Sequence, residues 1–347
     1  MSAPSSEAAR PLALPDKVAF LRHPDAYPER PEQVEVRETH LSFVFLTPTR
    51  AYKMKKPVAH EFVDLRTPER RRDNCLAEVA LNRRLAPDVY LGVVALTQEA
   101  SGALALDGAG AAVEWLVCMR RLPATAMMDH LIAQSLLRRA DIAAVAQRLG
   151  EFFAAQPAAA LTAEWFNAHL RSQLDASVRL LARAELALPR TTIAFVHDLL
   201  SRYLDAGTEL AARVRGGRIV EGHGDLRPEH ICIATPPIVI DCLEFSRDLR
   251  LVDPFDEIAF LGLECARLGA PGVGPAVRRS VAAILDDRPP ARLSLFYTAL
   301  RACVRARLAI ARLLEPGPTP AQHWRARALD YLSRAQRACI ALDRLAR

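Results

Sequence analysis

The chain has 347 residues, of which 51% are hydrophobic and 25% are charged, and its formal net charge at pH 7 is +6. This composition is typical of a folded globular protein and excludes a disordered chain, and the length predicts two domains or one two-lobed unit. No run of about 18 apolar residues is free of charge, which argues against a membrane protein, and the modest, dispersed basic excess argues against a nucleic-acid partner.

The N-terminus and the cysteines bear on the compartment. Residues 1–7 have neither a basic start nor an apolar stretch, so they do not resemble a secretory signal. The seven cysteines are scattered singly without a CxxC pair, which is typical of free, buried thiols in a reducing compartment. We therefore expect a cytoplasmic protein.

The lysines are few and unevenly placed. Only four of the 46 basic residues are lysines, three of them lie within residues 53–56, and none follows in the rest of the chain. An Arg- and Ala-rich composition, as a GC-rich genome encodes, explains why lysine is rare. It does not explain the cluster, which marks residues 53–56 for attention.

The first 120 residues predict a small sheet with one helix. Residues 1–30 are rich in Pro and Ala and are expected to be an extended N-terminal extension with at most one short helix near 16–21. Apolar patterns then predict antiparallel strands and Gly-rich or Pro-containing turns between them. Thr67 as N-cap and Pro68 at the first helical position predict a helix that runs to Pro87. The predicted strands cover 34–38, 43–46, 51–55, 91–97 and 113–119.

From residue 129 onward the pattern is helical, with one β-like interruption. The interruption spans residues 218–240 and contains short apolar runs around a polar loop. The predicted helices cover 129–154, 162–184, 191–213, 256–268, 275–286, 291–314 and 319–345.

The densest polar cluster of the chain lies in this interruption. It reads Glu-Gly-His-Gly-Asp-Leu-Arg-Pro-Glu-His over residues 221–230, and Asp241 follows the next apolar run. Two carboxylates at the ends of neighbouring strands can serve as a general base and a metal ligand. Two other readings stay open: a polar turn with a capping Asp, and a metallohydrolase site with His223, Asp225 and His230 as ligands.

The order of these motifs resembles the protein-kinase-like fold. A strand with Ala-x-Lys, a helix with Glu, a strand leading into a hinge, and then His-x-Asp and Asp are most similar to the aminoglycoside phosphotransferase family. Residues 38–40, 52–57 and 81–87 resemble an uncharacterised bacterial branch that is sometimes fused to a P-loop ATPase, although this chain has no GxxxxGK[ST] motif. The resemblance covers roughly residues 30–315.

The resemblance implies an α+β fold with two lobes. The N-lobe, residues 31–120, would be a small antiparallel sheet with one helix. The larger C-lobe, residues 121–347, would be mainly helical and would contain the catalytic loop at 221–245.

The resemblance also implies a nucleotide site in the N-lobe. Lys53 matches the lysine that contacts the α- and β-phosphates, with Lys55 on the same face of the strand as the alternative. Ala51 would leave room for adenine. Glu78 matches the glutamate that pairs with the lysine, with Glu69 as its competitor. The alternative interpretations are that Lys53 is a solvated lysine on an edge strand and that Glu78 is an ordinary surface glutamate.

Further matches concern the hinge and the catalytic loop. Met119, in the strand 117–119, would offer backbone groups to adenine. Asp225 matches the catalytic base, and His223 would hold the loop. Asp241 matches the aspartate that binds Mg²⁺ between the phosphates. Asp256 matches a buried aspartate at a helix start that braces the catalytic loop, as an N-cap would through backbone N–H groups.

The chain departs from the family pattern in two places. His230 stands where the family has an asparagine that binds the second metal, and imidazole suits Mn²⁺ or Zn²⁺ better than Mg²⁺. No Gly-rich loop lies between the first strands, where the turn is residues 39–42. This turn therefore lacks the glycines that let backbone N–H groups surround a phosphate.

The sequence therefore favours an ATP-dependent phosphotransferase that acts on a hydroxyl of an unidentified small molecule, with Mg²⁺ or Mn²⁺. Candidate acceptor contacts are Arg227, Glu244, Arg301 and Arg305; if the last two face the acceptor, an anionic acceptor is favoured, and otherwise they form a solvated basic helix face. The alternatives are a nucleotide-binding pseudokinase and a metal-dependent hydrolase. No oligomeric state follows from the sequence.

Overall fold

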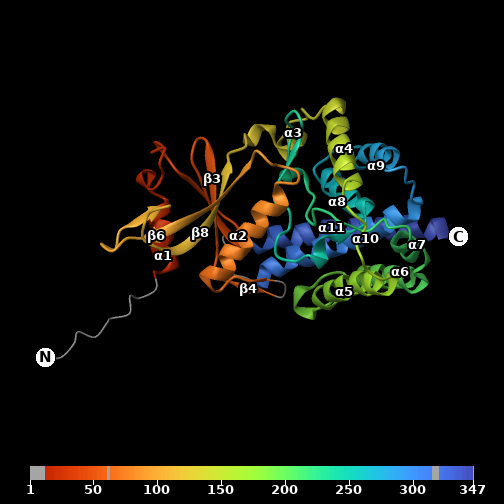
Figure 1. The fold of residues 1–347 in the computed structure, drawn as a ribbon. Coiled ribbons are helices and arrows are strands. Elements are labelled where there is room, and N and C mark those ends of the chain that lie inside the picture. The colour runs from red at the N-terminus through yellow and green to blue at the C-terminus, as the bar shows by residue number, and fades with distance from the viewer. Residues whose placement is uncertain (1–11, 61–62, 315–319, 347) are drawn as a thin grey trace. The chain divides into compact units, whose positions relative to one another are not determined.

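The computed structural model describes residues 12–60, 63–314 and 320–346. The chain divides into two units (Figure 1). Unit 1 contains residues 1–123 together with 239–246, and unit 2 contains residues 124–238 together with 247–347. The segment 239–246, which carries Asp241 and Glu244, therefore packs as part of unit 1, although most of it lies within the predicted catalytic loop at 221–245, which was expected in the C-lobe.

Unit 1 is built on a six-stranded antiparallel sheet in the order β1-β2-β3-β8-β6-β7. The five predicted strands are confirmed, and β7, which pairs with the end of β6, is an additional strand. The strands are β1 (Glu35–Glu38), β2 (Ser42–Leu46), β3 (Arg50–Lys55), β6 (Tyr90–Gln98), β7 (Leu104–Leu106) and β8 (Ala111–Arg120). A separate short pair, β4 (Ala59–His60) and β5 (Val63–Asp64), follows β3.

Helix α2 (Pro68–Asn82) packs on this sheet against β8 and β6. It begins as predicted, because the Thr67 hydroxyl accepts the N–H of Arg70 and Pro68 stands at the first helical position. The residues that it buries include Cys75, Glu78 and Asn82. A helix otherwise rich in arginine thus places a carboxylate and an amide under the sheet, where each needs a polar partner.

The predicted N-terminal extension contains a helix that is tied to the sheet. In α1 (Leu14–Leu21), Lys17 donates to the Glu114 carboxylate of β8 at 2.8 Å and to the Val113 carbonyl oxygen at 2.8 Å. Arg71 of α2 forms a bidentate pair with the same carboxylate at 2.7 Å. Because Lys17, Arg71 and Glu114 are all buried, this charge network fastens α1 and α2 to one strand.

Unit 2 is mainly helical, and α10 lies at its centre, packed against α5, α6, α8 and α11. No helix among the described residues is long and apolar enough to cross a membrane. The helices are α3 (Met128–Ala133), α4 (Arg139–Ala154), α5 (Ala163–Leu181), α6 (Arg190–Ala206), α7 (Thr208–Arg215), α8 (Pro254–Arg267), α9 (Val273–Ile284), α10 (Ala291–Ala311) and α11 (Ala321–Ala346). Short strands are β9 (Val220–Glu221), which pairs with β12 (Leu251–Val252), and β10 (Ile231–Cys232) and β11 (Ile238–Val239).

Two predicted helices are each broken in the structure. The helix predicted over 129–154 is wrong, because Ser135 adopts a left-handed conformation with φ of 57° between α3 and α4. The helix predicted over 191–213 ends at Gly207, whose φ of 59° closes α6 before α7 begins. Glycine adopts this conformation without a Cβ penalty, so a single glycine is enough to stop the helix.

Helices α8 and α9 approach each other closely at a pair of glycines. A Cβ added to Gly262 of α8 would lie 2.9 Å from the Cα of Gly274 in α9. The contact is backbone against backbone, so no flexible side chain can move aside. Glycine at this position therefore sets the distance between the two helices.

We predict that Gly262→Ala lowers the free energy of unfolding by about 1–3 kcal/mol, because the added methyl group forces the helices apart. Gly272→Ala is the matched control, since a Cβ there meets no atom within 4 Å. Urea unfolding of both variants measures the difference. Equal stability of the two variants would contradict the role assigned to the helix crossing.

Candidate functional site

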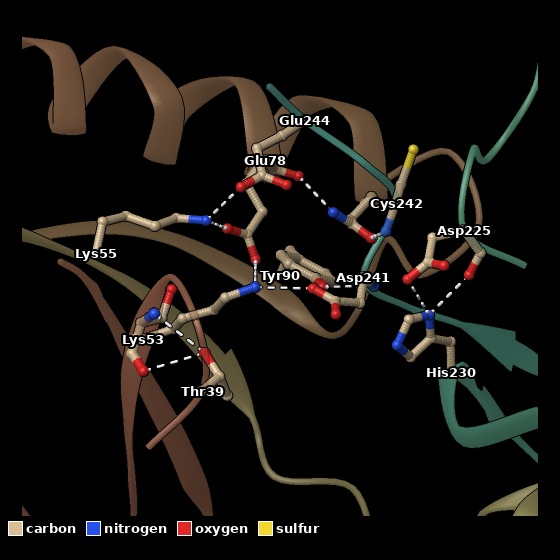
Figure 2. Close-up of polar contacts among 12 residues, drawn as sticks. Thr39, Lys53, Lys55, Glu78, Tyr90, Asp225, His230, Asp241, Cys242 and Glu244 are labelled. Carbon is tan, nitrogen blue, oxygen red and sulfur yellow. Dashed lines mark hydrogen bonds and ion pairs between the residues drawn. The ribbon is translucent and has the colours of Figure 1, made fainter. Parts of the chain in front are cut away.

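Strand β3 presents Ala51, Lys53 and Lys55 at alternate positions, as predicted. Lys53 Nζ donates to Glu78 Oε1 of α2 at 2.9 Å and to Asp241 Oδ1 at 2.7 Å (Figure 2). The competing Glu69 lies exposed in the first turn of α2. The structure thus brings three of the predicted site residues together in unit 1.

Lys55 belongs to the same group of ion-paired side chains, but it is almost completely buried. This group, the Lys53 cluster, consists of Lys53, Lys55, Glu78, Asp241 and Glu244. Its Nζ lies 2.5 Å from Glu78 Oε2 and 2.5 Å from Glu244 Oε1 (Figure 2). The side chain of Lys55 is 1% exposed, whereas that of Lys53 is 14% exposed. Glu78, 0% exposed, therefore gives one oxygen to each lysine, and Lys53 is the lysine that a ligand can reach.

The ion pairs keep these buried groups charged. Burial alone would lower the pKa of Lys53, but Asp241 and Glu78 outweigh it and raise that pKa well above its ordinary value of 10.5. Burial alone would raise the pKa of Glu78, but Lys53 and Lys55 outweigh it and hold that pKa below its ordinary value of 4.5. The pairing thus favours the charged forms of Lys53 and Glu78.

Asp241 is held by its backbone and leaves its side chain accessible. Its φ is 61°, a left-handed conformation that is uncommon outside glycine. Its N–H donates to the Tyr90 hydroxyl at 3.1 Å, and the N–H of Cys242 donates to Asn82 Oδ1 of α2 at 2.8 Å. The Asp241 side chain is 42% exposed, so its carboxylate is the accessible acidic group of the cluster.

Side chains close the glycine-free turn between β1 and β2. The Thr39 hydroxyl accepts the N–H of Ser42 at 3.0 Å, and the Thr39 N–H donates to the Ser42 carbonyl oxygen at 2.8 Å (Figure 2). Lys56 donates to Glu38 at 2.6 Å and to the Thr39 carbonyl oxygen at 2.7 Å, and its ammonium lies 4.8 Å from the centre of the Phe43 ring. Lys56, the third lysine within residues 53–56, therefore stabilises this turn.

In unit 2, a buried carboxylate supports the predicted catalytic loop. Both oxygens of Glu257, in the first turn of α8, accept the N–H of His223 at 3.0 Å, and one also accepts the N–H of Gly224. The N–H of Asp225 donates to His223 Nδ1 at 3.3 Å. Burial raises the pKa of Glu257, and the two backbone N–H groups oppose that shift. Sequence reasoning missed this residue.

The prediction that Asp256 caps this helix is wrong. The N-cap is Asp253, which accepts the N–H of Phe255 at 2.9 Å and pairs with Arg213. Asp256 instead forms a bidentate pair with Arg301 of α10 at 2.7 Å. Asp followed by Pro at the first helical position is an N-cap signal that the sequence contained at residue 253.

His230 and Arg227 bond to other groups of the predicted catalytic loop. Arg227 lies 2.9 Å from Asp225 Oδ2, 2.6 Å from Glu229 Oε1 and 3.0 Å from His230 Nε2. His230 Nδ1 lies 2.9 Å from the Asp225 carbonyl oxygen, which only accepts, so Nδ1 carries the proton and Nε2 accepts from Arg227. In this arrangement both ring nitrogens are bonded to groups of the same loop, and the metal role of His230 stays a prediction.

The described part of the chain contains no group of three or more His, Cys, Asp or Glu side chains that is arranged to hold a metal ion. A metallohydrolase site at His223, Asp225 and His230 therefore gains no support from the structure.

The arginines predicted to contact the acceptor have carboxylate partners on α8. Arg301 pairs with Asp256, and Arg305 lies 3.1 Å from Glu264, which also accepts the Tyr331 hydroxyl. Both arginine side chains are largely covered. The alternative of a solvated basic face on α10 is wrong for these two residues, and their contact with an acceptor stays a prediction.

Two further residues that hold the cluster were not found from the sequence. Asn82, which accepts the N–H of Cys242, stands four residues after Glu78 and donates to the Glu78 carbonyl oxygen at 2.8 Å. That spacing places both on one face of α2, a signal that the sequence contained. Tyr90, which receives the Asp241 N–H, lies alone at the start of β6, and no sequence pattern marked it.

No family model matches the chain. It is 32% identical over 302 residues to the uncharacterized proteins Rv2004c of Mycobacterium tuberculosis and Mb2027c of Mycobacterium bovis. The matched region covers 86% of this chain but only 59% of the length of each relative.

Solved structures of small-molecule kinases share the fold. Choline kinase from Cryptosporidium parvum is 10% identical, with a TM-score of 0.57 over 95% of this chain and 97% of that chain. A choline/ethanolamine kinase family protein from Mesorhizobium loti is 14% identical, with a TM-score of 0.53 over 93% and 98%. The GDP and kanamycin complex of APH(2")-IIia is 14% identical, with a TM-score of 0.54 over 92% and 97%.

The chain has the two-lobed α+β fold of these kinases, and the predicted fold class is confirmed. At these identities the likeness establishes the fold. The relation to chains fused to a P-loop ATPase stays a prediction.

The ion pairs of Glu78 make a prediction about pH. Because the pKa of Glu78 in the folded protein lies below 4.5, its pairing stabilises the fold fully above about pH 4.5 and is lost as the pH falls further. We expect Glu78→Gln to lose about 3–5 kcal/mol of stability at pH 7, as breaking a buried pair does, and the gap to the wild type to close as the pH falls toward 3.

Urea unfolding between pH 7 and pH 3 measures this gap. Asp73→Asn, on the exposed face of the same helix, is the matched control and should remain close to the wild type throughout. A constant gap for Glu78→Gln across this range would show that Glu78 is not held as an ionised group.

Proposed function

We propose that the protein is a phosphotransferase that transfers the γ-phosphate of ATP to a hydroxyl group of a small molecule. The observation that carries the proposal is the meeting of Lys53, Glu78 and Asp241 in unit 1. Enzymes that transfer phosphoryl groups on kinase-like folds use a strand lysine paired with a helix glutamate, and an aspartate that binds the metal. Here the three residues lie on the corresponding elements.

The nucleotide is assigned to unit 1. Lys53 would exchange its bond with Asp241 for the phosphate oxygens of ATP, while Glu78 continues to hold its ammonium. The adenine would lie near Ala51 and Met119, which are direct partners across β3 and β8. A small residue beside the strand that carries the hinge leaves the space that a flat base requires.

The carboxylate of Asp241 fits a divalent cation shared with the nucleotide. Mg²⁺ prefers oxygen ligands and is commonly bound through one or two carboxylates together with substrate phosphates, which agrees with one accessible carboxylate and no complete metal cluster among the described residues. When bound, the cation would neutralise the charge that develops on the phosphate oxygens. Asp241 would position it after releasing Lys53.

The acceptor hydroxyl is assigned to Asp225 in unit 2. Its side chain is 28% exposed, and the loop that carries it is fixed by Glu257 from α8. Asp225 would orient the hydroxyl and accept its proton as the new P–O bond forms, the bond between the γ-phosphorus and the bridging oxygen breaks, and ADP leaves. Arg227, already bonded to Asp225, balances the charge of this carboxylate in the resting state.

The names of the structural neighbours guide the choice of assay. Choline kinase and the kanamycin complex point to small polar acceptors, and one neighbour was solved with GDP. ATP and GTP should therefore be compared directly. The matched region covers 59% of the length of the mycobacterial relative Rv2004c. The acceptor is therefore proposed only as a class, a small polar molecule with a hydroxyl group.

A nucleotide-binding module without turnover is the second candidate. It is favoured by His230, which replaces the second metal-binding asparagine and directs both ring nitrogens to partners inside the loop. Such a module would keep the Lys53 cluster and bind the nucleotide without transferring phosphate.

We predict that Asp225→Asn and Asp241→Asn each lower the rate of ATP hydrolysis, with water in place of the acceptor, by about 100-fold or more, the scale on which general base catalysis acts. Asp225→Asn should leave the affinity for the nucleotide unchanged, whereas Asp241→Asn should weaken its metal-dependent part. Assays with Mg²⁺ and with Mn²⁺, together with calorimetric titration of nucleotide, separate the two effects.

Asp198→Asn, on the exposed surface of α6, is the matched control for these variants. Tight nucleotide binding without turnover under either metal would favour the second candidate. A wild-type protein that binds neither ATP nor GTP would overturn both.

We also predict that Lys53→Arg abolishes ATP turnover whereas Lys56→Arg retains it. A guanidinium fork does not reproduce the point contact of an ammonium at the half-buried Lys53, while an arginine at position 56 can still reach Glu38 and the Thr39 carbonyl oxygen. The two variants carry the same chemical change three residues apart. Equal turnover by both would show that Lys53 does not mark the nucleotide site.

A further inference from the structure

We propose that Lys55 is a positioning residue that sets both Glu78 and the segment carrying Asp241 for the reaction. The inference rests on the proposed function, because it concerns the same cluster. It assigns to the second lysine of the strand a role different from the phosphate contact considered from the sequence.

The burial of Lys55 excludes direct contact with a nucleotide in this arrangement. Its side chain is 1% exposed, and its ammonium lies between Glu78 Oε2 and Glu244 Oε1. A buried ammonium is tolerated only where anionic partners compensate for its lost hydration. Lys55 is therefore an internal counter-ion, and its effect on a ligand must pass through the two carboxylates.

The first carboxylate is Glu78, which binds a different lysine with each oxygen. Two cations on opposite oxygens fix the rotation of the carboxylate group. Without Lys55, Glu78 would be free to turn both oxygens toward Lys53 and hold it back from the phosphates. Lys55 thus determines how Glu78 presents Lys53.

The second carboxylate is Glu244, three residues after Asp241. Several contacts hold the segment between them. Tyr90 accepts the Asp241 N–H, Asn82 accepts the Cys242 N–H, Arg84 donates to Cys242 Sγ, and Lys55 pairs with the Glu244 side chain. Asp241 has a left-handed backbone, a conformation that persists at a non-glycine residue only where its surroundings enforce it. Lys55 supplies the buried charged anchor of that segment, beside the more exposed pair of Lys53 with Asp241.

The exposure of these side chains leads to the same conclusion. Lys55, Glu78 and Glu244 are 1%, 0% and 8% exposed, whereas the side chain of Asp241 is 42% exposed. The buried pairs of Lys55 therefore lie behind the most accessible of the three carboxylates. That carboxylate stands at the position where the proposed function requires a cation.

The test compares Lys55→Met with Lys17→Met. Both remove a buried lysine from an ion pair in unit 1, but Lys17 pairs with Glu114 and touches no residue of the Lys53 cluster. We expect both variants to lower stability in urea unfolding. Per folded molecule, only Lys55→Met should lower kcat for ATP hydrolysis, by about 100-fold, the scale of loss when a catalytic group is misplaced, and weaken Mg·ATP binding.

Two further variants separate positioning from simple stabilisation. In the Lys55→Met background, adding Glu78→Gln should lower kcat by much less than Glu78→Gln does alone, because residues that act as a unit are not additive. The double variant Lys55→Met/Glu244→Leu also removes the buried carboxylate that Lys55 pairs with, and it should regain stability without regaining kcat. If Lys55→Met does not fold, this double variant carries the comparison.

The outcomes distinguish this inference from the proposed function. An active wild type with unchanged kcat and Mg·ATP affinity in Lys55→Met, or recovery of kcat together with stability in the double variant, overturns the positioning role alone. A wild type that binds no Mg·ATP overturns the proposed function and this inference together. If the wild type binds without turnover, loss of affinity in Lys55→Met but not in Lys17→Met supports the inference, and equal affinities overturn it.

Discussion

The buried carboxylate of Glu78 is the point on which the organisation of unit 1 depends. It is inaccessible to solvent, so its charge exists only because Lys53 and Lys55 compensate it from two sides. Through these two lysines it joins α2 to β3 and to the segment that carries Asp241 and Glu244. One ionised group thereby fixes the relative positions of three chain segments far apart in sequence.

Unit 2 also uses a buried glutamate, at the predicted catalytic loop. Glu257 is buried in the first turn of α8 and accepts the backbone N–H groups of His223 and Gly224. Backbone donors take the place that the lysines have in unit 1. In both units a helix carries a buried glutamate to a loop or strand, and the accessible aspartate, Asp241 or Asp225, lies beside the group that this glutamate holds.

The three lysines within residues 53–56 show how much of the site could be predicted from the sequence. The alternation of β3 and the resemblance predicted Lys53 and its partner Glu78, and the structure brings them together. The sequence offered no account of Lys56, which closes the turn before β2, and treated Lys55 only as a substitute for Lys53. Their partners, Glu38 and Glu244, lie on other segments, so strand periodicity alone does not identify them.

By itself the sequence determined the fold class, the strands of unit 1, the start of α2 and the residues of the two motifs, because these depend on periodicity, caps and local order. Only the tertiary structure decided that Glu257 rather than Asp256 supports the predicted catalytic loop, that Arg301 and Arg305 are neutralised by α8, and that Lys55 is an internal counter-ion. The physical reason is that charge compensation in the interior depends on which side chains meet across elements, and such meetings leave no local pattern in the chain.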